Sequence, residues 1–326
     1  MCDSLKMIMI CLIILFFVLV PEESTSATNQ DFLFSFAVLS DIHIQSFDRQ
    51  SHQLFLRSLE DHKSISPQSS LLILNGDLTD GFDHDYRKLK ELLRRVPHPN
   101  LFATMGNHDY YQLWDRRHFG KKLNPSWSSE KANKLFLSHF KYNQVFHDTW
   151  LNGCHFIFLS GERYRDVDKS VGESAYLSKE QLRWLEERLR DKPSHPDNEM
   201  IPTFVFLHQP IENTISASDE GLFNILDNVK RQVFLFSGHT HQDLEQPEAV
   251  SNGHIHMIKS GSVRNVLRDK NKVDKSESLA VEVYRNRIII KKREHLKRRW
   301  ILPHTIIDLR NSQVPPLDTI SSEVNP

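Results

Sequence analysis

Residues 71–80 read LLILNGDLTD. The first four, Leu71–Leu74, form the short uninterrupted apolar run that is typical of a buried strand. Gly76 follows, and because glycine lacks a Cβ atom it lets the backbone turn sharply where the strand ends. Asp77 and Asp80 then place two carboxylates directly after that turn. The stretch therefore predicts a strand that leads into a chemically active loop.

The same order, an apolar run and then a polar cluster, recurs four more times. The runs and their clusters are Phe32–Leu39 before Asp41 and His43, Leu101–Ala103 before Asn107, His108 and Asp109, Thr203–Leu207 before His208, and Val233–Phe236 before His239 and His241. Amphipathic stretches at 47–62 and 86–96 predict helices between the first three strands. Alternating strands and helices indicate an α/β sheet, in which the carboxyl ends of the strands meet at one edge. We therefore expect the five clusters to converge on one site.

The clusters offer carboxylates, an amide oxygen and imidazoles, a set of ligands that suits Mn, Fe or Zn. Asp41 and His43 are two residues apart, as are His239 and His241, so an extended backbone would direct both members of each pair to one side. Asp77 has two carboxylate oxygens, each of which can take one ion. Two ions about 3.5–4 Å apart can activate a water molecule and hold a phosphoryl group.

In this order and spacing, the motifs Asp-x-His, Gly-Asp-x-x-Asp, Gly-Asn-His-Asp, a lone His and Gly-His-x-His resemble those of the calcineurin-like metallophosphoesterases. The resemblance extends from about residue 32 to about residue 291. It implies a four-layer α/β/β/α sandwich with the site at the carboxyl ends of the strands. It also implies a cofactor of two metal ions.

The resemblance implies a role for each matching residue. Asp41, His43 and His241 would hold one metal, Asn107, His208 and His239 would hold the second, and Asp77 would bridge them. His108 would face the substrate and stabilise or protonate the leaving-group oxygen, while Asp109 would orient its ring. A metal-bridging hydroxide would attack phosphorus directly, so the expected activity is hydrolysis of phosphate monoesters or diesters.

Two other functions are compatible with the same motifs: a cyclic-nucleotide phosphodiesterase of this family, and a non-catalytic metal-binding scaffold. One position departs from the purple acid phosphatases, a branch of the family that carries tyrosine three residues after the bridging aspartate. Here that position is Asp80, so an iron–tyrosinate colour is not expected. We expect Asp80 to support the metal ligands by hydrogen bonding.

Composition narrows the class of protein. The 326 residues carry a net charge of -1, with 39% hydrophobic and 25% charged residues, values ordinary for a globular domain. A neutral balance argues against a dedicated nucleic-acid-binding protein. Cys154 is the only cysteine after residue 11, so the chain is not a disulfide scaffold.

The amino terminus resembles a targeting segment. Lys6 precedes an uncharged apolar run at residues 7–20, and small and polar residues follow, the pattern of a secretory signal cleaved after Ala27. The alternative is an uncleaved membrane anchor, although a span needs about 20 apolar residues. Either way, we expect the protein to be secreted or extracytoplasmic.

We therefore divide the chain into a signal at 1–27, a catalytic domain at 28–292 and a basic extension with a tail at 293–326. Six of the nine residues in Lys291–Arg299 are basic. A solvated surface is the ordinary interpretation of such a run. Weak association with anionic envelope polymers or lipids is the alternative.

Overall fold

The computed structural model describes residues 31–115, 122–191, 202–217, 221–246 and 253–310. The chain divides into the segment Met1–Asp31 and a compact unit that begins at Phe32. The predicted signal and its cleavage position lie outside the described residues. Within the described ranges, none of the helices combines the length and the apolar character needed to cross a membrane.

The first sheet has six strands in the order β15-β14-β13-β1-β2-β3. Its parallel half consists of the predicted strands, β1 (Phe32–Leu39), β2 (Leu71–Asn75) and β3 (Asn100–Thr104). Its antiparallel half consists of β13 (Glu277–Tyr284), β14 (Arg287–Glu294) and β15 (Arg299–Asp308). Residues 285–286 join β13 to β14.

The second sheet has five strands in the order β10-β9-β7-β5-β4. Four run parallel: β5 (Cys154–Phe158), β7 (Thr203–Phe206), β9 (Val233–Ser237) and β10 (Ile255–Lys259). The edge strand β4 (His147–Leu151) pairs antiparallel with β5. The predicted strands at 203–207 and 233–236 both lie in this sheet.

A layer of aromatic rings joins the two sheets. Alternation along β1 directs Phe36 toward the second sheet, where its ring centroid lies 5.3 Å from that of Phe156 and 5.1 Å from that of Phe204. The neighbours Ala37 and Leu39 point to the opposite face, into the cluster that also contains Phe55 of the first helix. Because the central strands β2, β5, β7 and β9 bury both faces, their runs are continuously apolar rather than alternating.

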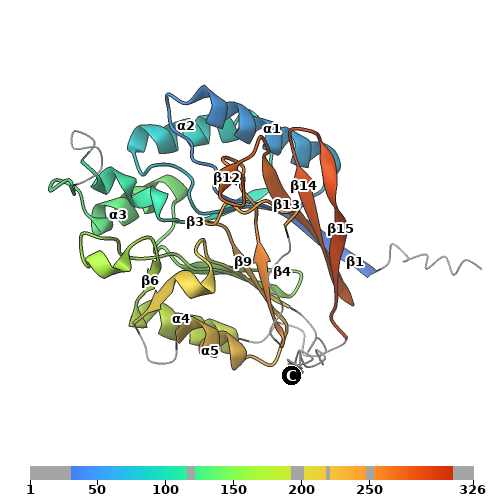
Figure 1. Ribbon diagram of the computed structural model, residues 1–326. Coiled ribbons are helices and arrows are strands. Elements are labelled where there is room, and N and C mark those ends of the chain that lie inside the picture. The colour runs from blue at the N-terminus through green and yellow to red at the C-terminus, as the bar shows by residue number, and fades with distance from the viewer. Residues whose placement is uncertain (1–30, 116–121, 192–201, 218–220, 247–252, 311–326) are drawn as a thin grey trace, which may run out of the picture. The chain divides into compact units, whose positions relative to one another are not determined.

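Helices cover the outer face of each sheet, and this confirms the predicted four-layer sandwich. Figure 1 shows α1 (Arg49–Ile65) and α2 (Asp83–Leu93) on one side, and α4 (Lys179–Arg190) and α5 (Gly221–Asp227) on the other. The side chain of Ser178 caps α4 by accepting a hydrogen bond from the Gln181 amide at 3.1 Å.

Shorter elements connect these layers. They are α3 (Ser129–Phe140), the 3-10 turns η2 (His108–Leu113), η4 (Lys169–Val171) and η5 (Ile211–Asn213), and the short strands β6 (Ala175–Leu177), β8 (Thr214–Ser216), β11 (Leu267–Arg268) and β12 (Asn271–Lys272).

The predicted domain boundary at residue 292 is wrong, because the first sheet continues beyond it. Strand β14 ends at Glu294, and β15 then pairs with it along its length. The basic run at 291–299 is correspondingly not a free basic surface. Arg293 is buried and donates to Asp61 of α1 at 2.7 and 2.9 Å, while Lys291 pairs with Glu282 and Arg299 with Glu245.

The buried ion pair between Asp61 and Arg293 yields a prediction about the stability of the fold. Burial alone would raise the pKa of Asp61, but hydrogen bonds from His295 and Arg293 hold it well below its usual range. Asp61→Asn is expected to lower the free energy of unfolding by about 3–5 kcal/mol near pH 7, because Arg293 is left buried without a charged partner. Chemical denaturation measures the change.

The pH dependence of that loss has a definite sign. A carboxylate with a depressed folded pKa stabilises the fold above its unfolded pKa of about 3.9, and this contribution disappears as the pH falls. The difference in the free energy of unfolding between wild type and Asp61→Asn should therefore become smaller below about pH 4. Glu130→Gln, in an exposed pair with Lys134, is the control and should leave the denaturation midpoint in place. Equal denaturation midpoints for Asp61→Asn and wild type at pH 7 would show that the pair between Asp61 and Arg293 does not stabilise the fold.

Candidate metal centre

The five predicted clusters do converge at the carboxyl ends of the strands. Their backbone is unusual, because five residues of the site have positive φ angles. These are Asp41 (53°), His43 (49°), Asp77 (49°), His239 (68°) and His241 (54°). Such values are uncommon for residues other than glycine and cost energy, so they persist only where surrounding contacts impose them. The expectation of an extended backbone at the two His-containing pairs is therefore wrong, although both members of each pair still face the site.

Backbone hydrogen bonds between loops hold this geometry. The amide of Asp41 donates to the carbonyl of Gly76 at 3.2 Å, and the amide of His43 donates to that of Asp77 at 2.9 Å. The amide of His239 in turn donates to the Asp41 carboxylate at 3.1 Å. Three loops from distant parts of the chain are thus fixed against one another before any side chain binds an ion.

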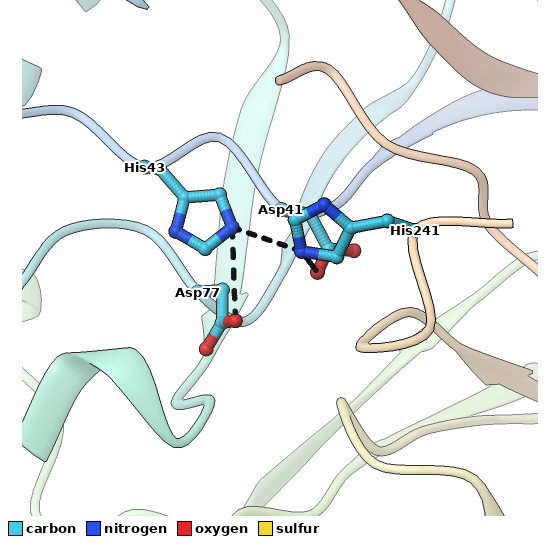
Figure 2. Close-up of side chains that lie close together, drawn as sticks. All are labelled: Asp41, His43, Asp77 and His241. Atoms are coloured by element: carbon cyan, nitrogen blue, oxygen red, sulfur yellow. Dashed lines mark hydrogen bonds and ion pairs between the residues drawn. The ribbon is translucent and has the colours of Figure 1, made fainter. Parts of the chain in front are cut away.

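The first group of side chains contains Asp41, His43, Asp77 and His241, whose ligand atoms all lie within 4.8 Å of one another. Figure 2 shows them pointing toward a common centre. Nε2 of His241 lies 3.1 Å from Oδ1 of Asp41 and 3.1 Å from Nε2 of His43. His241 donates from Nδ1 to the Asn265 carbonyl at 3.0 Å, so its Nε2 lone pair faces the group.

The second group is formed by Asn107, His208 and His239. Nδ1 of His208 donates to the Asn75 carbonyl at 2.8 Å, which leaves Nε2 as the ring atom directed at the site, 3.2 Å from Oδ2 of Asp77. Nε2 is buried and has no hydrogen-bond partner among the described residues. Nδ1 of His239 lies 2.9 Å from Oδ1 of Asn107. Acceptors that face one another in a buried site fit a cation between them.

Asp77 links the two groups through a single oxygen. Its Oδ2 faces His43 at 3.8 Å and His208 at 3.2 Å, while its Oδ1 accepts the backbone amide of His108 at 2.9 Å. The expectation that each oxygen would serve one ion therefore does not match this geometry. The structure nevertheless brings all seven predicted ligands together.

The charges of the site favour a cation. Burial alone would raise the pKa of Asp41, but His241 and His208 lower it to about 2. Burial likewise opposes protonation of His208 and His241, yet the carboxylates of Asp77 and Asp41 raise the pKa of each histidine to about 9. Binding of metal at these positions would therefore be linked to the release of protons.

Three glycines permit the close approach of these loops. A Cβ atom on Gly106 would lie 2.2 Å from Oδ1 of Asp77, and one on Gly238 would lie 2.4 Å from Oδ2 of Asp41. Gly76 has a φ of 77° and leaves no room for a Cβ beside His208. These contacts explain why glycine precedes three of the predicted ligands.

Gly106→Ala is therefore expected to displace the Asp77 carboxylate and weaken metal binding about 10–100-fold, the range found when the support of a metal ligand is removed. Gly253→Ala is a suitable control, because nothing lies within 4 Å of the added Cβ, although its positive φ adds local strain. Titration with Mn²⁺ measures the affinity of each variant. Unchanged affinity in Gly106→Ala would show that the loop adjusts without moving Asp77.

His108 lies at the edge of the site with its ring partly exposed. Its Nδ1 is 3.3 Å from Oδ1 of Asp80, its Nε2 is 4.0 Å from Oδ2 of Asp77, and its ring stacks on Tyr111 with centroids 3.9 Å apart. Burial alone would lower the pKa of His108, but Asp77 and Asp80 raise it. An accessible imidazole whose protonated form is favoured can donate a proton to a substrate oxygen.

Asp109 does not orient that ring, and this corrects the predicted role. It is fully buried and accepts hydrogen bonds from the Gly106 amide at 2.9 Å, the Leu78 amide at 3.2 Å and the Tyr86 hydroxyl at 2.9 Å. Burial and the nearby Asp77 raise the pKa of Asp109 to about 6. His108 and Asp109 begin a 3-10 turn, in which successive side chains diverge by about a third of a turn.

Asp80 takes the position that was expected for Asp109. It contacts Nδ1 of His108 and also accepts a hydrogen bond from Gln45. Glu173 is a further residue of the site, since it accepts from Nδ2 of Asn107 at 2.9 Å. No local motif marks Glu173, which lies 66 residues from Asn107 in the chain.

Comparisons with known proteins agree with this geometry. Residues 34–243 match the family described as calcineurin-like phosphoesterase. A probable glycerophosphodiester phosphodiesterase, GpdQ, from Arcobacter nitrofigilis is 25% identical over 221 residues, which cover 63% of this chain and 70% of that protein.

Two solved structures share the fold at low sequence identity. A dimetal phosphatase from Danio rerio is 12% identical with a TM-score of 0.58, over 86% of this chain and 100% of that chain. The purple acid phosphatase PPD1 from yellow lupin is 9% identical with a TM-score of 0.56, over 88% of this chain and 57% of the other. The arrangement of two sheets between helices is therefore shared with phosphatases that differ widely in sequence.

Proposed function

We propose that this chain, which belongs to the calcineurin-like phosphoesterase family, is a phosphodiesterase that uses two metal ions. Family membership makes it a metal-dependent hydrolase of phosphoesters. The observation that carries the finer proposal is the convergence of six other predicted ligand side chains around Asp77, with the buried Nε2 of His208 directed at the site.

The donor set fits two divalent or trivalent ions, and we propose Mn, Fe or Zn from its carboxylates, imidazoles and amide. Asp41, His43 and His241 would hold one ion, Asn107, His208 and His239 the other, and Asp77 both. Bound ions of this kind acidify water and neutralise phosphoryl oxygens, so no serine or cysteine nucleophile is needed.

The protein's own groups then position the substrate and move the proton. His108 is the accessible acid, and Asp80 orients it by accepting at Nδ1. Hydrogen bonds between the loops hold the proposed ligands in position, so these side chains need little rearrangement during the reaction. His108 lies on the edge of the site, where the leaving-group oxygen of a bound ester would emerge.

Two observations favour diesters over monoesters. The relative from Arcobacter nitrofigilis is named as a probable diesterase. The acidic side chain of Asp80 borders the site at His108. A monoester carries nearly two negative charges at neutral pH, whereas a diester carries one, so a carboxylate at this position disfavours the monoester more strongly.

The test is hydrolysis of bis(p-nitrophenyl) phosphate and p-nitrophenyl phosphate by protein supplied with Mn²⁺, Zn²⁺ or Fe²⁺. We expect a higher kcat/KM on the diester. A preference for the monoester would reject the diesterase assignment, and hydrolysis of cyclic AMP alone would support the cyclic-nucleotide alternative. Binding of two metals without hydrolysis of any ester would identify a non-catalytic scaffold.

Export is a second part of the proposal. It is supported by the uncharged run at residues 7–20 and the small residues that follow it. Expression of the full chain in a secreting host, followed by mass determination of the product, tests it. A mature chain beginning at Thr28 is the expected product. A full-length, membrane-bound product would favour the anchor instead.

A further inference from the structure

Glu173 lies in the turn between η4 and β6, and its carboxylate gathers four donors. Oε2 accepts from Nδ2 of Asn107 at 2.9 Å and from the Tyr111 hydroxyl at 3.1 Å. Oε1 accepts from the Tyr164 hydroxyl at 2.8 Å and from Arg165 at 2.9 Å. Every partner of this carboxylate is thus a donor, and Arg165 balances its charge.

The backbone of Glu173 is fixed as firmly as its side chain. Gln209 donates to the Glu173 carbonyl at 3.3 Å, one residue after the predicted ligand His208. The preceding Gly172 has φ 58° and ψ -127°, a conformation that residues with a Cβ rarely adopt. The turn therefore aims the carboxylate at Asn107 with little freedom.

An asparagine amide presents an oxygen and a nitrogen of nearly equal size, so its shape alone does not decide which one faces a metal. A carboxylate accepts hydrogen bonds and cannot donate them. Glu173 therefore binds the NH₂ end of Asn107, and this leaves Oδ1 directed at Nδ1 of His239, 2.9 Å away. A metal ion can bind Oδ1, which has lone pairs, but not the NH₂ nitrogen, which is only a donor.

We propose that Glu173 is a positioning residue for the second metal position, because it fixes the orientation of the Asn107 amide. The proposal rests on the proposed function only in taking Asn107 and His239 as metal ligands. It extends the site by a residue from a loop outside all five motifs.

Glu173→Gln tests this directly, since glutamine keeps the size of the side chain but adds a donor. Oε1 of the new amide is needed by Arg165, so its NH₂ group would face Asn107 and drive the Asn107 amide to flip. We expect the affinity for the second Mn²⁺ to fall about 10–100-fold while the first remains as in wild type. Calorimetric titration of the metal-free protein, without substrate, measures both affinities. Glu180→Gln, exposed on α4, is the matched control.

A reversed pair distinguishes orientation from general damage. In the double variant Asn107→Asp with Glu173→Gln, the donor and the acceptor exchange places, and either oxygen of the introduced carboxylate can face the metal. We expect this variant to recover the second Mn²⁺ site. Asn107→Asp alone would not, because it places a second carboxylate directly opposite that of Glu173. The four proteins form a double-mutant cycle with a clear coupling. Circular dichroism checks that each variant is folded.

Three results would overturn the proposal: wild-type affinity for both ions in Glu173→Gln, equal weakening of both sites, or no recovery in the double variant. These readouts are independent of catalysis. A wild-type protein that binds two ions and hydrolyses no phosphoester would reject the proposed function and leave this inference standing.

Discussion

Asp77→Asn is expected to empty both metal positions at once. Oδ2 of Asp77 is the atom that faces histidines of both groups, so its loss weakens two sites with one substitution. An amide is neutral, and its single oxygen can still accept the His108 amide in place of Oδ1. We expect affinity at both positions to fall by more than about 100-fold, beyond the effect of removing a supporting residue.

The measurement is metal content after reconstitution and dialysis, with kcat on a diester recorded in parallel. Wild type should retain close to two ions per chain. His43→Asn is the matched control, because His43 faces only the first group and its loss should weaken one site. An Asp77→Asn protein that retains one ion at wild-type affinity would show that Asp77 does not serve both positions.

The buried strands were predictable because an uninterrupted apolar run is itself typical of a strand that is buried on both faces. Strands β1, β2, β7 and β9 are short apolar runs that bury both faces, so the sequence signal is strong and local. The edge strands β4 and β15 carry no such signal. Strand β4 reads HDTWL, and β15 contains Arg299, Trp300 and Pro303, so each is a strand chiefly because a neighbouring strand pairs with it.

Burial of charge was the main feature hidden from the sequence. The basic run at 291–299 resembles a solvated face, yet Arg293 is buried because Asp61, more than 200 residues earlier, meets it from α1. No periodicity within the run reveals that partner. Pairing over such a separation depends on the packing of α1 against the first sheet, which only the folded structure supplies.

The convergence of the seven predicted ligands was predictable from the sequence, but the contacts that support them were not. Each predicted ligand follows a strand in a recognisable motif, so the seven side chains lie close together as expected. The supporting contacts depend on backbone directions instead: the 3-10 turn at His108 turns Asp109 inward and leaves Asp80 to meet the imidazole. Glu173 reaches Asn107 from a loop with no motif at all.

His108→Ala is expected to separate catalysis from metal binding. Asn107 is the neighbouring ligand, but the ring of His108 lies at the edge of the site, held by Asp80 and stacked on Tyr111. Its loss should leave both metal positions intact. Positioned acids contribute about 10²–10⁴-fold, so kcat on a diester with a poor alkyl leaving group should fall within that range. His84→Ala, at a largely exposed histidine on α2, should keep wild-type activity.

The dependence on leaving group then reveals what His108 does. Nitrophenolate leaves with little need for a proton, so a much smaller loss on bis(p-nitrophenyl) phosphate would identify His108 as the general acid. An equal loss on both substrates would instead assign it to stabilising charge on the phosphoryl oxygens, an effect of about 10²–10³-fold. Loss of metal from His108→Ala would make the residue a ligand, and wild-type rates on every ester would remove it from the mechanism. The contact with Asp80 favours the first outcome, because a carboxylate at Nδ1 keeps the proton on Nε2 until the leaving oxygen takes it.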